Sequence, residues 1–161
     1  SLSFLSTKNN LVTETHHFTD FNGTLAEDGS LAVKIELNSV ETNIAIRNER
    51  MREHLFKLFP TANLTAQLPN EVMGLDVGES MPLEVKGQLE LNSKTQILTM
   101  QLQVTRLANE QLLATTVQPV LVNSVQFGLT DGIKKLQELA GLASIDQTVP
   151  VTFNVVFNAA N

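Results

Sequence analysis

The chain has 161 residues, enough for one domain with a full core or an enclosed cavity. It carries 11 Lys and Arg against 17 Asp and Glu, a net charge of −6. This balance argues against nucleic acid as the main partner, and against attachment to an anionic membrane by charge alone. There is no cysteine, so disulfides and a thiolate nucleophile are excluded.

Two further features of the composition limit the possible functions. The eight Phe are accompanied by no Tyr and no Trp, which lowers the case for sugar or single-strand nucleic-acid binding. No run of 18 apolar residues occurs, so we predict no membrane-spanning segment. Because the chain begins at Ser1, we expect that a preceding segment, such as a signal peptide, was lost to processing or cut away for expression.

Most of the chain alternates apolar and polar residues with a period of two, for example over 31–37 and 83–91. Successive side chains of a strand face opposite sides, so each such run has one apolar face. Short turn segments follow or precede several runs, and Asn22-Gly23 also fits a turn dipeptide, so neighbouring strands should be antiparallel. The predicted strands are 2–8, 11–18, 31–40, 62–68, 83–92, 95–106, 111–121 and 149–157.

Two segments break this alternation. Residues 48–56 predict a short helix, and residues 130–141 predict a longer one that begins near Thr130 or Asp131 and ends at Gly141. Eight strands with one apolar face form a sandwich or a barrel, and strands of about ten residues favour the closed form. We therefore predict an all-β, antiparallel, eight-stranded barrel that is either filled with side chains or holds one small ligand.

The polar residues give little support for catalysis or for a metal. His16 and His17 are adjacent in a predicted strand and point to opposite faces, and His54 is the only other histidine. Zinc sites usually have three or four nitrogen or sulfur ligands. No nucleophile motif and no phosphate-binding loop occurs. We predict no metal, no cofactor and no catalytic residue.

The segment 47–54 gathers three arginines and one histidine. In one interpretation its charges form the solvated face of a helix that closes one end of the sheet, with Met51 and Leu55 facing inward. In the other, one arginine contacts a ligand head group or a buried carboxylate, because Arg binds anions with two hydrogen bonds. Arg47, expected just before the helix, is the best candidate.

Several segments occur in an order and spacing that suggest a family. They are the opening strand at 3–9, the histidine-bearing strand 17–23, the strand 33–40, the Arg47-Asn48 step leading to Phe59-Pro60, and the closing 149–153. In this order the chain resembles the YceI-like family of bacterial polyisoprenoid-binding, lipocalin-like proteins over almost its whole length. Many members have Asp where this chain has Asn48.

The resemblance implies a single lipocalin-like, lipid-binding barrel domain over residues 1–161, and export to the periplasm or secretion. The expected ligands are polyisoprenoids, isoprenoid quinones, and fatty amides or acids, bound without catalysis for carriage or storage. Arg47 and His17 are candidate head-group contacts. If the barrel closes as predicted, the candidate lining residues are Val33, Ile35, Val85, Leu89, Met100, Leu102, Phe153 and Val155.

Two alternatives stay open at this point. One is a structural or partner-binding β-sandwich with a filled core and no small-molecule ligand. The other is an esterase-like or isomerase-like enzyme that uses a histidine inside the barrel. The sequence leaves open whether the chain forms a dimer.

Overall fold

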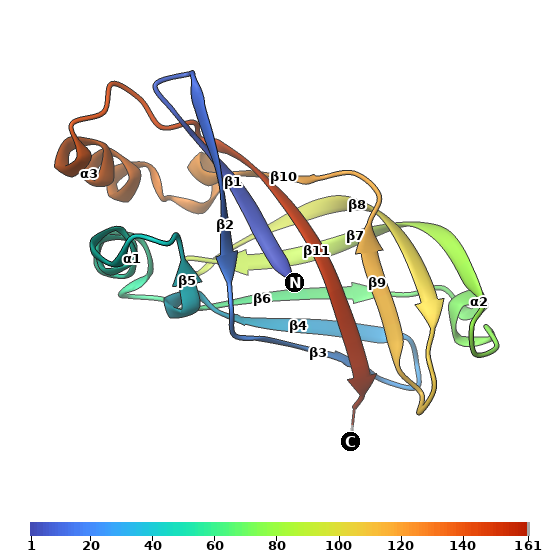
Figure 1. The fold of residues 1–161 in the computed structure, drawn as a ribbon. Helices are drawn as coiled ribbons and strands as arrows, with labels where there is room; N and C mark the ends of the chain where they lie inside the picture. Colours follow the sequence, from blue (N-terminus) through green and yellow to red (C-terminus); the bar gives the residue numbers. More distant parts are fainter. Residues whose placement is uncertain (161) are drawn as a thin grey trace.

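A computed structural model describes residues 1–160 and shows a mainly β protein with a few short helices (Figure 1). All the strands join one continuous sheet. The strands are β1 (Leu2–Lys8), β2 (Val12–Phe18), β3 (Phe21–Leu25), β4 (Ser30–Glu36), β5 (Val40–Glu41), β6 (Thr61–Gln67), β7 (Ser80–Leu91), β8 (Lys94–Arg106), β9 (Leu112–Thr116), β10 (Val120–Asn123) and β11 (Thr148–Ala159).

Seven of these strands close into a barrel. Their order is β3-β4-β6-β7-β8-β9-β11, and β11 returns to β3 through a parallel pairing that includes Phe157 and Gly23. The other pairings in the barrel are antiparallel. The predicted all-β barrel is therefore confirmed, whereas the count of eight strands and the fully antiparallel pairing were wrong.

The missed barrel strand is β3, which contains Asn22 and Gly23. A Cβ at Gly23 would lie 2.8 Å from a ring carbon of Phe157 and 2.9 Å from a methyl carbon of Val155. Gly23 is thus a site where two strands approach closely, and not the second residue of a turn. The Asn-Gly pair was misleading at the level of sequence because the reason for the glycine is a contact with the far end of the chain.

The remaining strands extend the sheet beyond the barrel. Both β1 and β10 pair with the first half of β11, and β2 and β5 continue outward from β1. The predicted strand 111–121 is divided into β9 and β10 around Pro119, which lacks a backbone N–H for strand pairing. The predicted strand 31–40 ends at Glu36 and continues as the 3₁₀ turn η1 (Leu37–Ser39).

The helices lie at the two ends of the barrel. In Figure 1, α1 (Ala45–Met51) and α3 (Thr130–Ala140) lie at one end, and α2 (Asn70–Met73) lies at the other. The π-helical turn η2 (Arg52–Phe56) continues α1, and the 3₁₀ turn η3 (Ser124–Phe127) precedes α3. The predicted helix 48–56 began three residues late, α3 matches its prediction to within one residue, and α2 was not predicted. Within residues 1–160, no helix is long and apolar enough to cross a membrane.

The barrel interior is filled at the α2 end. Val72 of α2 is fully buried, and the guanidinium of Arg106 donates a hydrogen bond to its carbonyl oxygen at 3.4 Å. We call this region the filled half. Its core residues are all at most 5% exposed: Leu25, Leu31, Leu68, Val72, Val104, Leu112, Ala114 and Phe157.

Candidate functional site: an apolar cavity under the helical cap

The other half of the barrel contains a cavity of about 190 Å³. We call this region the hollow half. Strand residues form its walls, and its roof consists of Met51, Leu55 and Phe56 from α1 and η2 with Leu129 and Ile133 at the start of α3. The surface that faces the cavity is wholly apolar. The segment 45–56 thus closes one end of the barrel and turns Met51 and Leu55 inward, as the helical spacing predicted.

Six of the eight candidate lining residues lie in the cavity wall: Val33, Ile35, Leu89, Met100, Phe153 and Val155. Val85 and Leu102 are also buried, but they do not line the cavity. Val85 pairs with Met100 on the next strand, and Leu102 lies two residues further toward the filled half. Alternation identifies which face of a strand is inside, but it does not show how deep along the barrel a residue lies. Contact of any of these residues with a ligand stays a prediction.

Several lining residues were not among the sequence candidates. Phe4 and Phe18 on the β1–β2 hairpin pack ring to ring with centroids 5.3 Å apart, and Phe18 meets Phe56 of η2 at 6.0 Å. Ala62 and Leu64 on β6 also face the cavity. The alternation in the predicted strands 2–8 and 62–68 contained the signal for Phe4, Ala62 and Leu64, whereas the roof depends on long-range packing.

A polar cluster lies beside the roof, between the β1–β2 hairpin and α1. One terminal nitrogen of Arg47 lies 3.1 and 3.2 Å from the two Glu14 oxygens, and the other donates to the Thr42 carbonyl at 2.6 Å. Lys8 is 3.0 Å from Glu14. The hydrogen bond from Lys8 lowers the pKa of the Glu14 carboxyl, and Arg47 lowers it further against the opposing effect of burial.

Arg47 therefore contacts a partly buried carboxylate, one of the two roles considered for it. It lies inside α1 and not before the helix. Its Nε is buried and has no hydrogen-bond partner in the part of the chain that the structure describes. The other arginines of the segment donate to carbonyls: Arg50 to Leu139 at 3.4 Å and Arg52 to Asn38 at 2.8 Å.

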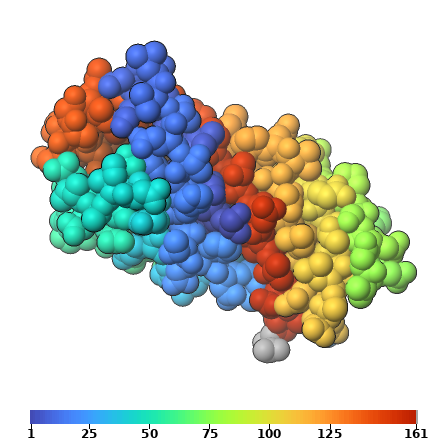
Figure 2. Space-filling model, viewed as in Figure 1, coloured from blue at the N-terminus to red at the C-terminus, as the bar shows by residue number. Residues whose placement is uncertain are grey.

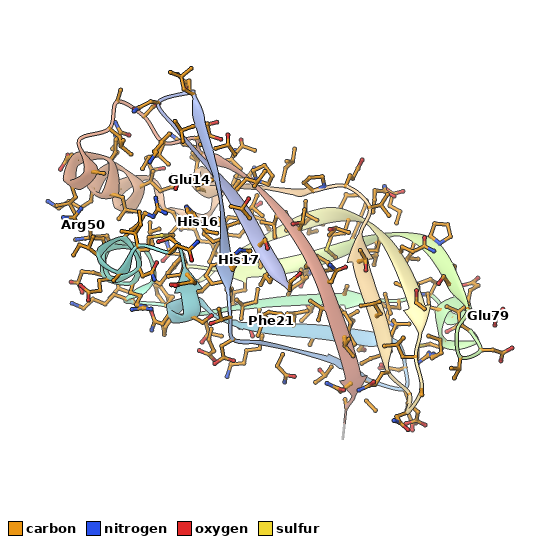
Figure 3. The ribbon with its side chains drawn as sticks, in the orientation of Figure 1. Glu14, His16, His17, Phe21, Arg50 and Glu79 are labelled. Atoms are coloured by element: carbon orange, nitrogen blue, oxygen red, sulfur yellow. The ribbon has the colours of Figure 1, made fainter. Side chains whose placement is uncertain are left out.

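The two adjacent histidines face opposite sides of β2, and the inward one is His16. It is 4% exposed, and its ring meets Phe4 edge-on with centroids 5.4 Å apart. Its Nδ1 is buried without a partner among residues 1–160. His17 is exposed and its Nδ1 lies 2.8 Å from the Ser3 hydroxyl. The head-group contact predicted from the sequence, His17, is therefore the outward-facing histidine. Both histidines are labelled on β2 in Figure 3.

Burial changes the chemistry of His16. Desolvation lowers its pKa, and the nearby positive charge of Arg47 lowers it further. The imidazole is thus held neutral at pH 7. A neutral imidazole and the unpaired Arg47 Nε are polar atoms without partners beside an apolar cavity, and such atoms usually have a hydrogen-bond partner when a site is complete.

The Asn48 side chain connects α1 to the segment around β5, because it both accepts and donates hydrogen bonds. Its side-chain oxygen accepts hydrogen bonds from the Thr42 N–H at 2.9 Å and from the Thr42 hydroxyl. Its amide nitrogen donates to the Glu41 carboxylate. An ionised carboxylate could accept from Thr42 but could not donate to Glu41, so an amide fits this position beside Glu41 better than Asp does.

No group of three or more His, Asp or Glu that could hold a metal occurs within the described residues. The seven-stranded barrel, its apolar cavity and the adjoining polar cluster instead define a small barrel protein with an internal apolar binding cavity. The family model described as "YceI-like domain" matches residues 1–157, and the chain belongs to this family.

Solved structures of proteins from three bacteria share the fold. A polyisoprenoid-binding domain from Saccharophagus degradans, implicated in plant cell wall breakdown, is 35% identical with a TM-score of 0.91, covering 99% of this chain and 93% of that one. BcnA of Burkholderia cenocepacia is 16% identical with a TM-score of 0.69, covering 96% and 95%. The YCEI protein of Campylobacter jejuni is 13% identical with a TM-score of 0.58, covering 91% and 85%. No curated protein matches the sequence.

Proposed function

We propose that this protein binds a long-chain amphiphilic lipid in the hollow half of the barrel, without catalysis, for carriage or storage. The observation that supports this most is the cavity of about 190 Å³ with a wholly apolar surface. Apolar cavities of about 150 Å³ stay dry and take up hydrocarbon guests such as benzene. A cavity of about 190 Å³ with the same kind of wall favours a hydrocarbon chain over water.

An isoprenoid tail is the ligand class that we favour. The 35% identical relative is a polyisoprenoid-binding domain, and it aligns with nearly the whole chain. The driving force is removal of the tail from water, about 25 cal/mol per Å² of apolar surface before the costs of binding. Isoprenoid quinones and fatty amides or acids share this tail chemistry and are the other candidates.

The cavity holds only part of a long tail in the ligand-free protein, so we expect the lining to adjust. Met51 lies in the roof and Met100 at the boundary with the filled half. Methionine side chains are unbranched and repack easily. Their movement lengthens the space along the barrel axis without opening the sheet.

We propose that the polar head group lies at His16 and Arg47. The buried Nδ1 of His16 and the buried Nε of Arg47 have no hydrogen-bond partner among residues 1–160, and a head group would satisfy both. A quinone or amide oxygen accepts from the Arg47 N–H, and the neutral His16 ring adds a second hydrogen bond. Arg47→Ala and His16→Phe should each weaken binding of a quinone while leaving that of a headless hydrocarbon unchanged. Unchanged quinone affinity in a folded Arg47→Ala protein would contradict this role.

The first test is native mass spectrometry of protein purified without detergent, followed by organic extraction. The expected result is a stoichiometric adduct that extracts as a long-chain lipid. A bare protein that also fails to take up added quinones, polyprenyl phosphates and fatty amides would overturn the proposal.

A cavity-filling variant makes this test specific to the hollow half. Ala62→Phe places a benzene-sized ring in a cavity that is large enough for benzene, so the fold should tolerate it while lipid uptake is lost. Ala32→Phe is the matched control, because Ala32 lies in a groove on the outer face of the neighbouring strand β4. Equal lipid uptake by the two variants would show that the lipid does not enter this cavity.

Both alternatives make different predictions. A filled sandwich requires a solid interior, whereas this chain forms a closed barrel with a cavity. An enzyme that uses a histidine inside the barrel would rely on His16, and turnover lost in His16→Phe would support it. The periplasmic or secreted location and the possible dimer stay predictions.

A further inference from the structure

Large apolar side chains are exposed on the elements that cap the cavity. Leu11, at the tip of the β1–β2 hairpin, is 87% exposed, and Ile46 on α1 is 51% exposed. Ile44, just before α1, and Leu139, near the end of α3, are also exposed. Exposed apolar residues are common one by one, but a group of them on adjoining elements usually marks an interaction surface.

Polar contacts hold these three elements next to one another. Arg47 of α1 binds Glu14 of the hairpin, and Arg50 of α1 donates to the Leu139 carbonyl of α3. Asn9, at the hairpin tip, accepts a hydrogen bond at 2.8 Å from the Ala143 N–H, just after α3. Figure 2 shows the hairpin, α1 and α3 together at one end of the molecule. The exposed apolar side chains therefore surround the roof of the cavity.

Arg50 also places a cation beside the apolar group. Ile46 and Arg50 are four residues apart in α1 and lie on the same side of the helix. Long basic side chains at a lipid–water boundary cover apolar surface with their stems and keep the charge in the polar layer. This pairing is typical of a helix that lies on a membrane surface.

Charge differs strongly between the two ends of the barrel. The capping segments 8–14, 41–59, 92–95 and 124–147 contain eight of the 11 Lys and Arg but seven of the 17 Asp and Glu, a net charge of +1. The cap is thus close to neutral in a chain whose net charge is −6.

The loops around the filled end are acidic. The segments 26–30, 70–80 and 106–111 contain six Asp and Glu, and their only cation is the buried Arg106. An anionic lipid surface repels this end and tolerates the cap. The charge distribution therefore favours an orientation in which the cavity roof, and not the filled end, faces an anionic bilayer.

We propose that the cap docks on a lipid bilayer, with Leu11, Ile46 and Leu139 inserted among the lipids and the filled end pointing away from the membrane. The docked orientation brings the roof formed by Met51 and Leu55 against the bilayer. Docking is a further activity beyond lipid binding in the cavity. In the docked orientation the cap is the surface through which an apolar ligand passes between the membrane and the protein without crossing water.

The absence of Trp and Tyr allows a direct measurement of docking. Leu11→Trp gives a protein with a single tryptophan at the proposed insertion point, and its emission can be excited selectively. Val77→Trp is the matched control, because Val77 is 69% exposed beside α2 at the opposite end. With vesicles of phosphatidylcholine and phosphatidylglycerol, the emission of Leu11→Trp should shift to the blue, and that of Val77→Trp should not.

Vesicle flotation supplies the second measurement. The double variant Leu11→Ser and Ile46→Ser should lower vesicle partitioning about a hundredfold, since each inserted side chain contributes roughly a tenfold factor. Val77→Ser with Val117→Ser, a change of two apolar residues that are more than half exposed and lie outside the capping segments, should leave partitioning unchanged.

Three results would overturn docking. They are equal blue shifts in the two Trp variants, no flotation of the wild-type protein, and a blue shift that depends on protein concentration without vesicles. The last result would make the cap a contact between two copies of the chain. Uptake of a quinone delivered in detergent is measured on the same variants. Lost docking with normal uptake, or the reverse, shows which of the two proposals fails.

Discussion

The two halves of the barrel are built from the same strands but have different interiors. On β11, Phe157 is 1% exposed within the filled half, and Phe153 is 8% exposed and lines the cavity. On β4, Leu31 lies in the filled half and Val33 and Ile35 in the hollow half. The pattern of alternation is the same on both sides. The two ends are also covered differently: Val72 and Leu68 are buried at the filled end, whereas α3, which covers part of the hollow half, has no buried residue.

This difference in packing assigns stability and ligand binding to different halves of the barrel. The well-packed interior contributes to the free energy of unfolding, because densely packed side chains make many favourable contacts. A loosely covered cavity forgoes part of that contact, and the space becomes available for a ligand. We expect substitutions in the filled half to act mainly on unfolding and substitutions in the hollow half mainly on binding.

The largest effect is expected from Phe157→Ala. Removing a fully packed aromatic ring should lower the free energy of unfolding by about 3–5 kcal/mol, because the surrounding strands cannot collapse into the space. Phe153→Ala is the counterpart in the hollow half and should cost less, since Phe153 already borders empty space. Urea unfolding of the ligand-free proteins measures both. Equal losses would mean that the two halves are packed alike.

Next comes Asn48→Asp, which tests how the cap is tied to β5. The substitution replaces the donating amide with a carboxylate that faces Glu41, so it removes one hydrogen bond and adds repulsion. We expect a loss of about 1–3 kcal/mol in the free energy of unfolding. Adding Glu41→Gln restores a donor opposite the new carboxylate and should recover much of the loss. If the double variant is no more stable than the single one, the proposed pairing is not what stabilises the cap.

A structural feature can be predicted from the sequence when neighbouring residues determine it, and it is missed when a residue far along the chain determines it. Strand alternation is local, and it placed Val33, Leu89 and Phe153 on the inner face correctly. The reason for a glycine at position 23 is not local, because the ring of Phe157, more than 130 positions away, leaves no room for a Cβ there. The strand β3 was missed for that reason.

The site shows the same limit. Alternation requires that His16 and His17 face opposite sides, but only the pairing of His16 with Phe4 shows which one is inside. Val85 and Leu102 lie on the inner face as predicted, but they belong to the packed core and not to the cavity wall, a distinction that alternation does not make. Depth depends on how the end of the barrel is covered, and α2 is too short for a periodic pattern to predict it.

Gly132→Ala tests the contact that holds the roof together. A Cβ at Gly132 would lie 2.3 Å from the His54 carbonyl oxygen of η2, so α3 has to move. Ala normally stabilises a helix relative to Gly, but here we expect a loss of about 1–3 kcal/mol and faster release of bound lipid. Gly74→Ala is the control, because its nearest contact would be an ordinary 3.7 Å. A Gly132→Ala protein as stable as the wild type, with unchanged release, would show that α3 does not depend on this close approach.

The smallest effect is the dependence of stability on pH. Burial and Arg47 lower the pKa of His16 below its ordinary 6.5 in the folded protein. The unfolded chain regains the ordinary value, so below pH 6.5 it binds a proton that the folded protein resists. The free energy of unfolding should therefore fall as the pH drops below about 6.5, and this loss should end once the pH is below the folded pKa.

The variant His16→Phe keeps the ring contact with Phe4 and removes the titrating group, so its stability should change less between about pH 7 and 5. Glu14 does not interfere in this range, because its lowered carboxyl pKa affects stability only below its ordinary 4.5. Parallel pH profiles for wild type and His16→Phe would contradict the burial of a neutral imidazole beside Arg47. A ligand that satisfies His16 Nδ1 should also alter the profile, which makes the slope between these pH values a direct report on the polar end of the hollow half.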